Sequence, residues 1–229
     1  MPSKRIYLTR HAQAGHNVAE DYSIPDAELT PLGRQQSAQL HEETKDGLQQ
    51  TVELIVSSPL RRPMQTMLVG YPDLKARLNH KVVLLPELQE VNHLPCDTGS
   101  SRAFLEEHDE FVKAGLDFSQ IDESEKRHGV GWTSKMGFFD AENVIERAKW
   151  VRRWLRERKE EKIVVIAHGD ILRVIQDGYR SDPQTHPWAN AEVRAFTFAS
   201  DDDEDAKLVL VKEVAKEGEE EPTSGEMKN

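Results

Sequence analysis

The chain has 229 residues, 37% hydrophobic and 31% charged, so we expect a globular protein that buries its core without staples. Its formal net charge of -11 disfavours nucleic acid and anionic membranes as partners, because their phosphates repel an acidic surface. A single cysteine excludes an intrachain disulfide, and neither a secretory signal nor a membrane-spanning run is evident. We therefore expect a cytoplasmic protein, and the composition leaves its oligomeric state open.

Six short segments rich in β-branched residues are predicted to be strands. The first four show little alternation of apolar and polar residues, which is typical of central strands covered on both faces. In chain order the six segments are 5–9, 53–56, 81–85, 162–167, 193–199 and 207–212.

Helical patterns lie between these strands. Thr30 followed by Pro31 predicts a helix start, and the helix should run to about Thr44. A second helix is predicted over 60–69 and a last one after His168. This alternation predicts an α/β fold, a three-layer sandwich with a mostly parallel central sheet.

A longer helix is predicted after Asp140, which can serve as its capping residue. The apolar side chains of this helix fall on one stripe. Arginines at 152, 153, 156 and 158 lie mostly outside the stripe, which favours a solvated basic face over a binding patch.

The region from about 87 to 139 breaks the alternation, because glycines, a proline, polar and aromatic residues are mixed there. We interpret it as an inserted cap region over one end of the sheet, within a domain of residues 1–212. Residues 213–229 form a polar, acidic tail that is predicted to be disordered.

Side chains suited to anion chemistry follow the carboxyl ends of four predicted strands. Arg10 and His11 end the first strand, and His168 follows the strand 162–167. Arginine follows the second strand at 61–62, and Glu90 follows the third. Because ligands bind at the carboxyl ends of strands in α/β sheets, these residues predict a single site.

Five motifs between residue 5 and about residue 179 resemble those of the histidine phosphatase superfamily, which includes phosphoglycerate mutases and fructose-2,6-bisphosphatases. R-H-A-Q-A-G-H-N at 10–17 resembles the opening Arg-His-Gly with its later asparagine, and Ala12 stands where the family has glycine. L-T-P-L-G-R-Q-Q at 29–36 resembles L-T-x-x-G-x-x-Q. S-P-L-R-R-P-M-Q-T at 58–66 resembles S-x-L-x-R-A-x-x-T, which places the second arginine on Arg62. L-Q-E ends at Glu90, and H-G stands at 168–169.

The resemblance implies a phosphatase that works through a phosphohistidine intermediate without a metal or cofactor. His11 would be the nucleophile, and Glu90 would be the acid that protonates the leaving oxygen. The phosphoryl oxygens would be held by Arg10, Asn17, Arg62, His168 and Gly169. Apart from this resemblance, no carboxylate cluster has convincing spacing for Mg²⁺ or Zn²⁺.

The substrate is expected to be a phosphorylated small molecule, but the sequence does not name it. Where the mutases have R-H-G-E-S-x-W-N, this chain has Gln13, Ala14 and His16, which favours the plant and fungal mutase-like group and phosphatase activity. A phosphomutase and a non-catalytic phospho-ligand binding protein are the alternatives. Candidates for determining specificity are Trp132, Ser134, Lys135 and Phe139.

Overall fold

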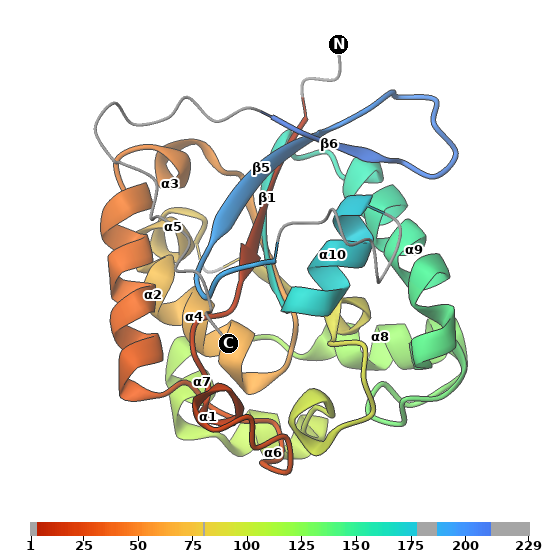
Figure 1. The fold of residues 1–229 in the computed structure, drawn as a ribbon. Helices are drawn as coiled ribbons and strands as arrows, with labels where there is room; N and C mark the ends of the chain where they lie inside the picture. The colour runs from red at the N-terminus through yellow and green to blue at the C-terminus, as the bar shows by residue number, and fades with distance from the viewer. Residues whose placement is uncertain (1–3, 80, 178–186, 212–229) are drawn as a thin grey trace, which may run out of the picture.

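A computed structural model describes residues 4–79, 81–177 and 187–211, and its centre is a six-stranded sheet (Figure 1). The strand order is β3-β2-β4-β1-β5-β6, and β3, β2, β4 and β1 are mutually parallel. β5 runs antiparallel to both of its neighbours. The strands are β1 (Arg5–Arg10), β2 (Leu54–Ser57), β3 (Val82–Leu84), β4 (Lys162–Ala167), β5 (Val193–Phe198) and β6 (Leu208–Leu210). All six predicted strands are confirmed, and so is the mostly parallel sheet.

Helices cover both faces of the sheet, as predicted for a three-layer sandwich (Figure 1). On one face lie α2 (Pro31–Thr44), α3 (Leu48–Thr51), α4 (Arg61–Gly70) and α5 (Pro72–Arg77). On the other face lie α9 (Val144–Glu157) and α10 (Gly169–Asp177). The predicted start of α2 is confirmed, because the Thr30 hydroxyl accepts a hydrogen bond from the Gly33 amide at 3.0 Å.

Side chains on the two faces of the central strands pack into two separate hydrophobic clusters. On β4, Ile163 and Val165 pack with α9 and α10, whereas Val164 and Ile166 pack with α2, α4 and α5. All four side chains are fully buried. Burial on both faces explains why these strands lack the alternating pattern of a half-exposed sheet.

Short helices between β3 and α9 gather at the end of the sheet where the parallel strands terminate (Figure 1). Their core joins Phe111, Ile121, Trp132 and Phe139 to Leu84 at the end of β3. In chain order the elements of this end and of the loop after β1 are α1 (Gly15–Val18), η1 (Pro86–Leu88), η2 (Pro95–Asp97), α6 (Arg102–Glu107), α7 (Asp109–Ala114), α8 (Ser119–His128), η3 (Gly137–Phe139) and η4 (Ala141–Asn143). The domain limits, including the insertion at 87–139, stay predictions, and the predicted tail 213–229 lies outside the described residues.

Two predictions about the long helix were wrong in detail. Asp140 caps the short η4 turn, accepting from the Glu142 amide, and α9 begins only at Val144. Its arginines form a solvated face only in part: Arg153 is exposed, but Arg152 is 3% exposed and donates to the Asp205 carbonyl at 2.9 Å. Arg153 and Arg156 donate to other carbonyls of the same acidic turn, so these cations hold the β5–β6 connection against the helix.

Candidate active site

The two predicted site histidines follow neighbouring strands. Arg10 and Ala167 are register partners in the parallel pair of β1 and β4, so His11 and His168 come next on each strand. The His11 amide continues the ladder by donating to the Ala167 carbonyl at 2.9 Å. The ring centroids of the two histidines are 5.2 Å apart. The separation of the two rings therefore follows from the spacing of adjacent strands.

The loop after His11 is held by residues of the second and third sequence motifs. The Ala12 amide donates to the Thr66 hydroxyl at 3.0 Å, and the Gln13 amide donates to the Gln36 side chain at 2.8 Å. A Cβ at Gly33 would lie 2.0 Å from the Gln13 carbonyl oxygen, so only glycine allows this approach. The motif residues thus fix the backbone that carries the histidine.

The hydrogen bonds of His11 define its tautomer. Its Nδ1 donates to the Ala12 carbonyl at 2.7 Å, because a carbonyl can only accept. Its Nε2 accepts from Nε of Arg62 at 3.1 Å, because a guanidinium can only donate. Burial, together with the charges of Arg62 and Arg10, lowers the pKa of His11 well below its usual value. The ring is therefore neutral at pH 7, with its lone pair on Nε2.

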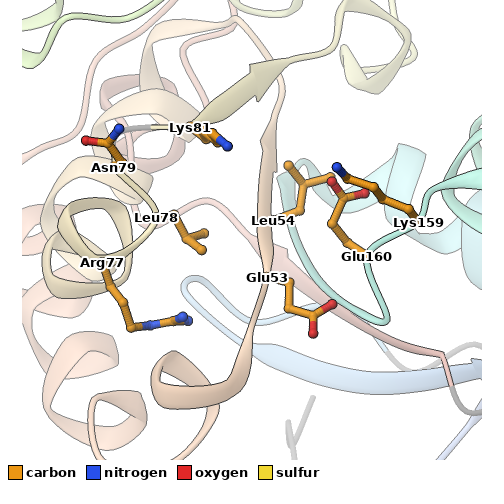
Figure 2. A pocket seen from close by; sticks show the side chains of 8 residues that line it. All are labelled: Glu53, Leu54, Arg77, Leu78, Asn79, Lys81, Lys159 and Glu160. Carbon is orange, nitrogen blue, oxygen red and sulfur yellow. The ribbon is translucent and has the colours of Figure 1, made fainter.

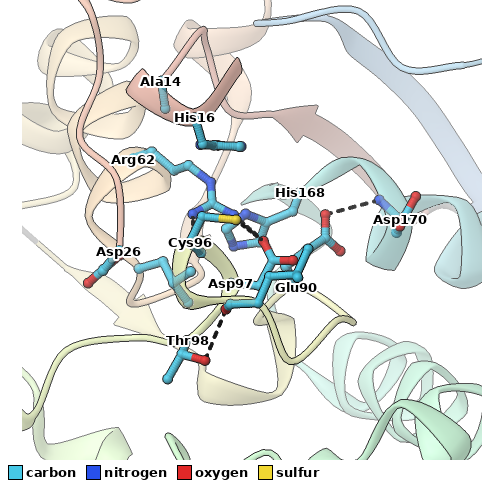
Figure 3. Close-up of polar contacts among 12 residues, drawn as sticks. Ala14, His16, Asp26, Arg62, Glu90, Cys96, Asp97, Thr98, His168 and Asp170 are labelled. Carbon is cyan, nitrogen blue, oxygen red and sulfur yellow. Dashed lines mark hydrogen bonds and ion pairs between the residues drawn. The ribbon is translucent and has the colours of Figure 1, made fainter. Parts of the chain in front are cut away.

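Arg62 lies almost fully buried beside this nitrogen, at the start of α4. One Nη donates to the Cys96 carbonyl, and the other donates to Oδ1 of Asp97 at 3.1 Å (Figure 3). Arg61, the neighbouring candidate, instead contacts Asp26 and Glu28. The structure thus places Arg62 in the site and Arg61 outside it, as the motif alignment predicts.

Arg10 is partly buried and lies against Gly169, whose missing Cβ would stand 3.5 Å from the Nε atom of Arg10. One Nη of Arg10 donates to the Trp188 carbonyl. The charge of Arg10 lowers the pKa values of His11 and His16. Arg10 therefore supplies the second cation of the site.

His168 lies beneath the site and is fully buried. Its Nε2 shares a hydrogen bond of 2.9 Å with Ser58, and burial lowers its pKa well below the usual value. Asn17 lines the cavity, but its Oδ1 accepts from the Ala14 amide and its Nδ2 contacts His16 at 3.1 Å. His16 also lines the cavity, and burial lowers its pKa to about 3.

Glu90 lines the same cavity and is 8% exposed. Its carboxylate accepts from the amides of Ile171 at 3.0 Å and Asp170 at 3.2 Å, in the first turn of α10. Two amides at the start of α10 therefore bind this side chain. Burial, reinforced by the charges of Asp97 and Asp170, raises the pKa of Glu90 to about 7. A carboxyl with that pKa can give and take a proton near neutral pH.

These groups surround a cavity of about 260 Å³. Its lining consists of Arg10, His11, His16, Asn17, Tyr22, Arg62, Glu90, Asn92, Leu94, Cys96, Asp97, Gly169 and Asp170. The predicted site residue His168 is not among the lining residues. Sequence reasoning missed the role of Asp97 and Asp170 in this wall, because neither belongs to a motif. Both lie close to motif residues along the chain, but their charges meet only through the fold.

The four specificity candidates do not line this cavity. Trp132 and Phe139 are buried in the hydrophobic core beneath it, and Ser134 is exposed. Lys135 is buried and donates to the backbone carbonyl of Glu90 at 2.7 Å. Arg147 on α9 is also fully buried, and its three nitrogens have no hydrogen-bond partner among the described residues. Its charge interacts with Glu90 and Glu87, whereas burial lowers the pKa of Lys135 to about 7, so Arg147 is the further cation beside the wall that carries Glu90.

A larger cavity of about 550 Å³ lies at the opposite end of the sheet, where strands β2, β3 and β4 begin (Figure 2). It is lined by Glu53, Leu54, Arg77, Leu78, Asn79, Lys81, Lys159 and Glu160. None of these described lining residues is a histidine, whereas His11 and His16 line the smaller cavity. Within the described ranges, three or more His, Cys, Asp or Glu side chains nowhere converge as a metal site would require. None of the helices described combines the length and apolarity needed to cross a bilayer.

Comparison with known proteins finds similar sequences. The sequence model of the histidine phosphatase superfamily (branch 1) matches residues 6–207. A Schizosaccharomyces pombe protein named "Probable phosphatase" is 26% identical, and the match covers 91% of this chain and 97% of that protein. Phosphoglycerate mutase-like protein 1 of Arabidopsis thaliana is 31% identical, with 85% of this chain and 81% of that protein covered.

Solved structures also resemble the fold. The alpha-ribazole phosphatase of Shigella flexneri superposes with a TM-score of 0.57 at 17% identity, covering 90% of this chain and 94% of that one. A phosphoserine phosphatase of Entamoeba histolytica superposes with a TM-score of 0.54 at 18% identity, covering 90% and 94%. At these identities the likeness concerns the fold, and the site must be judged on its own residues.

Proposed function

This chain belongs to the histidine phosphatase superfamily (branch 1), and we propose that it hydrolyses a phosphate monoester of a small metabolite through a phosphohistidine at His11. The observation that supports the proposal best is the state of the His11 ring. A neutral imidazole, whose Nε2 lone pair accepts only from Nε of Arg62, lines a cavity that also holds two arginines and a carboxyl group with a pKa of about 7.

In the first half-reaction, Nε2 of His11 attacks phosphorus, and the bond from phosphorus to the leaving oxygen breaks. Glu90 gives its proton to that oxygen, so the alcohol leaves uncharged. Arg10 and Arg62 balance the negative charge of the phosphoryl group during transfer, which is usually the largest contribution to catalysis. Asn17, His168 and Gly169 are proposed to complete the phosphoryl site.

In the second half-reaction, the ionised Glu90 takes a proton from water, and the water oxygen forms the new bond to phosphorus. The bond from phosphorus to Nε2 breaks, and inorganic phosphate leaves. Because Glu90 is returned to its protonated form, one carboxyl group serves both steps. The pKa of about 7 suits this exchange, since both protonation states are accessible at neutral pH.

We also propose that the reaction requires no metal ion. In the cavity, the guanidinium groups of Arg10 and Arg62 supply the positive charge that a bound cation would otherwise supply. The nucleophile is likewise a ring nitrogen that is already deprotonated, so no metal is needed to generate it.

The decisive experiment is His11→Ala, compared with His41→Ala as a matched control. His41 lies on α2 and pairs with Asp73 at 3.5 Å, outside the cavity. We expect turnover of p-nitrophenyl phosphate to fall by more than about a thousandfold in the first variant only. Labelled substrate followed by an alkaline quench should leave acid-labile label on the wild-type chain. A His11→Ala enzyme within about tenfold of wild type would refute the mechanism.

A phosphomutase is the second candidate, because Arabidopsis relatives carry mutase-like names. A mutase keeps the phosphohistidine until a second acceptor binds, whereas a phosphatase passes it to water. Chasing the labelled intermediate with unlabelled alcohol or with buffer alone distinguishes the two. Prompt release of inorganic phosphate in buffer supports the phosphatase.

A further inference from the structure

Each of the three guanidinium nitrogens of Arg62 donates a hydrogen bond to another group of the protein. Its Nε donates to His11. Its two Nη atoms donate to the Cys96 carbonyl and to Asp97, which lie beside it in Figure 3. Both sides of the Arg62–Asp97 ion pair are buried, with 1% and 7% of the side chains exposed. The carboxylate of Asp97 thus binds one branch of the guanidinium fork, the part of arginine that binds phosphate oxygens in pairs, and the Cys96 carbonyl binds the other.

A phosphoryl group on Nε2 of His11 would need the same donor. The Nε atom of Arg62 is 3.1 Å from Nε2 of His11, so the guanidinium lies at the reacting atom. Asp97 lines the same cavity and is 5% exposed. A phosphate dianion and the Asp97 carboxylate therefore compete for one cation, and their like charges repel each other across a small cavity.

We infer that Asp97 is a positioning residue that competes with phosphate for Arg62. The Arg62–Asp97 ion pair breaks when the phosphate group of the substrate binds Arg62, and it re-forms as inorganic phosphate leaves. The inference rests on the proposed function, because it takes the His11 cavity as the phosphate site. The competition would speed the release of inorganic phosphate, because a site with two free arginines would retain this dianion.

Asp97 also lies beside the proposed acid. Charged groups face Glu90 from several elements: Asp97 on η2, Asp170 on α10, Arg62 on α4, Arg10 on β1, Lys135 before η3 and Arg147 on α9. Among the charges that raise the pKa of Glu90, the charge of Asp97 has the largest effect. Loss of its charge should therefore favour ionised Glu90 at neutral pH.

The test compares Asp97→Asn with Asp97→Glu, which keeps the charge, and with Thr98→Ala as a control on a half-buried neighbour that does not line the cavity. Inorganic phosphate is the probe, titrated by calorimetry so that the readout does not depend on turnover. We expect Asp97→Asn to bind phosphate about tenfold more tightly, because a repelling charge is gone. The other two variants should bind within about threefold of wild type.

The second readout is the pH profile of kcat. In Asp97→Asn, the fall in kcat with rising pH should begin about one pH unit lower than in wild type. A structural role would act in the opposite sense, because loosening Arg62 would weaken phosphate binding. Weaker or unchanged binding by Asp97→Asn therefore overturns the inference. If the substitution lowers stability, the phosphate-induced rise in Tm, taken relative to the ligand-free Tm of each variant, gives the same comparison.

The proposed function and this inference fail in different ways. A wild-type protein that neither binds phosphate nor releases it from esters refutes both. A wild-type protein that does both, with Asp97→Asn binding no more tightly, refutes the role of Asp97 alone.

Discussion

Three buried histidines should make the folded protein sensitive to mild acid, and His16 is the one that can be tested most simply. Burial lowers the pKa of His16 to about 3 and lowers the pKa values of His11 and His168 well below the usual value. In the unfolded chain each ring regains a pKa of about 6.5, so unfolding takes up protons below that pH. Stability is therefore present above about pH 6.5 and declines as the pH falls toward the folded value.

The size of the effect follows from proton linkage. Each neutral buried histidine costs about 1.4 kcal/mol per pH unit once the unfolded ring is protonated, or about 2 kcal/mol between pH 7 and pH 5. Glu90 opposes this trend, because its pKa of about 7 in the fold makes the folded state bind a proton over the same range. For His16 alone, whose pKa in the fold is about 3, the loss of about 2 kcal/mol is a substantial fraction of typical domain stability.

The perturbation is His16→Gln, which keeps a hydrogen-bonding side chain of similar length but cannot titrate. Urea unfolding, followed by tryptophan fluorescence at several pH values from about 5 to 7, gives the free energy of unfolding for both proteins. The slope of that free energy against pH should be smaller in the variant by about 1.4 kcal/mol per pH unit. Its absolute stability does not matter, because only the slopes are compared. Parallel curves would show that His16 is protonated in the folded state and that its burial has been misjudged.

Four further experiments test other parts of the structure. Glu90→Gln should lower turnover of alkyl phosphates by about 10²–10⁴-fold, with a smaller loss at the phosphorylation step for p-nitrophenyl phosphate, and equal losses in single-turnover experiments would exclude a leaving-group acid. With wild-type enzyme, kcat should fall as the pH rises through about 7, as Glu90 loses its proton, and a profile that is flat there would contradict the assignment. Gly33→Ala should cost about 1–3 kcal/mol of unfolding free energy, because its Cβ would lie 2.0 Å from the Gln13 carbonyl oxygen, and an unchanged urea midpoint would show that the loop can shift. Activity should survive EDTA, and its loss with recovery on adding Mg²⁺ or Zn²⁺ would disprove the metal-free proposal.

Much of the fold could be predicted because its signals are local. The strand Lys162–Ala167 and the start of α2 at Thr30-Pro31 were placed correctly from β-branched residues and from capping chemistry. The candidate site was also accessible, because parallel strands bring their carboxyl ends to one edge of the sheet. The shared register of β1 and β4 then makes His11 and His168 neighbours.

The remainder depends on contacts between distant segments. Arg152 was predicted to be solvated, and nothing in its helix reveals that the turn at Asp205 supplies a carbonyl for it. Arg147 gave no signal either, since a charged residue within an amphipathic helix is ordinarily exposed. Asp97 lies 35 residues from Arg62 along the chain, and only the fold brings the two charges together. Such pairs carry no periodicity or motif that would identify them.

The nucleophile and the competitor of phosphate are anchored very differently, and this should be visible in native-state hydrogen exchange. The His11 amide belongs to the ladder between β1 and β4, and the Ser58 amide likewise donates to the Ile166 carbonyl of β4. Asp97 instead belongs to a single 3-10 turn, whose amides at 97 and 98 donate only to the carbonyls of Leu94 and Pro95. Amides at strand ends should exchange near the global unfolding limit, whereas those of the turn should open locally at much lower cost. Warming should therefore disturb phosphate affinity before it disturbs the bond-forming centre, and thermal loss of activity at saturating substrate should coincide with unfolding of the sheet.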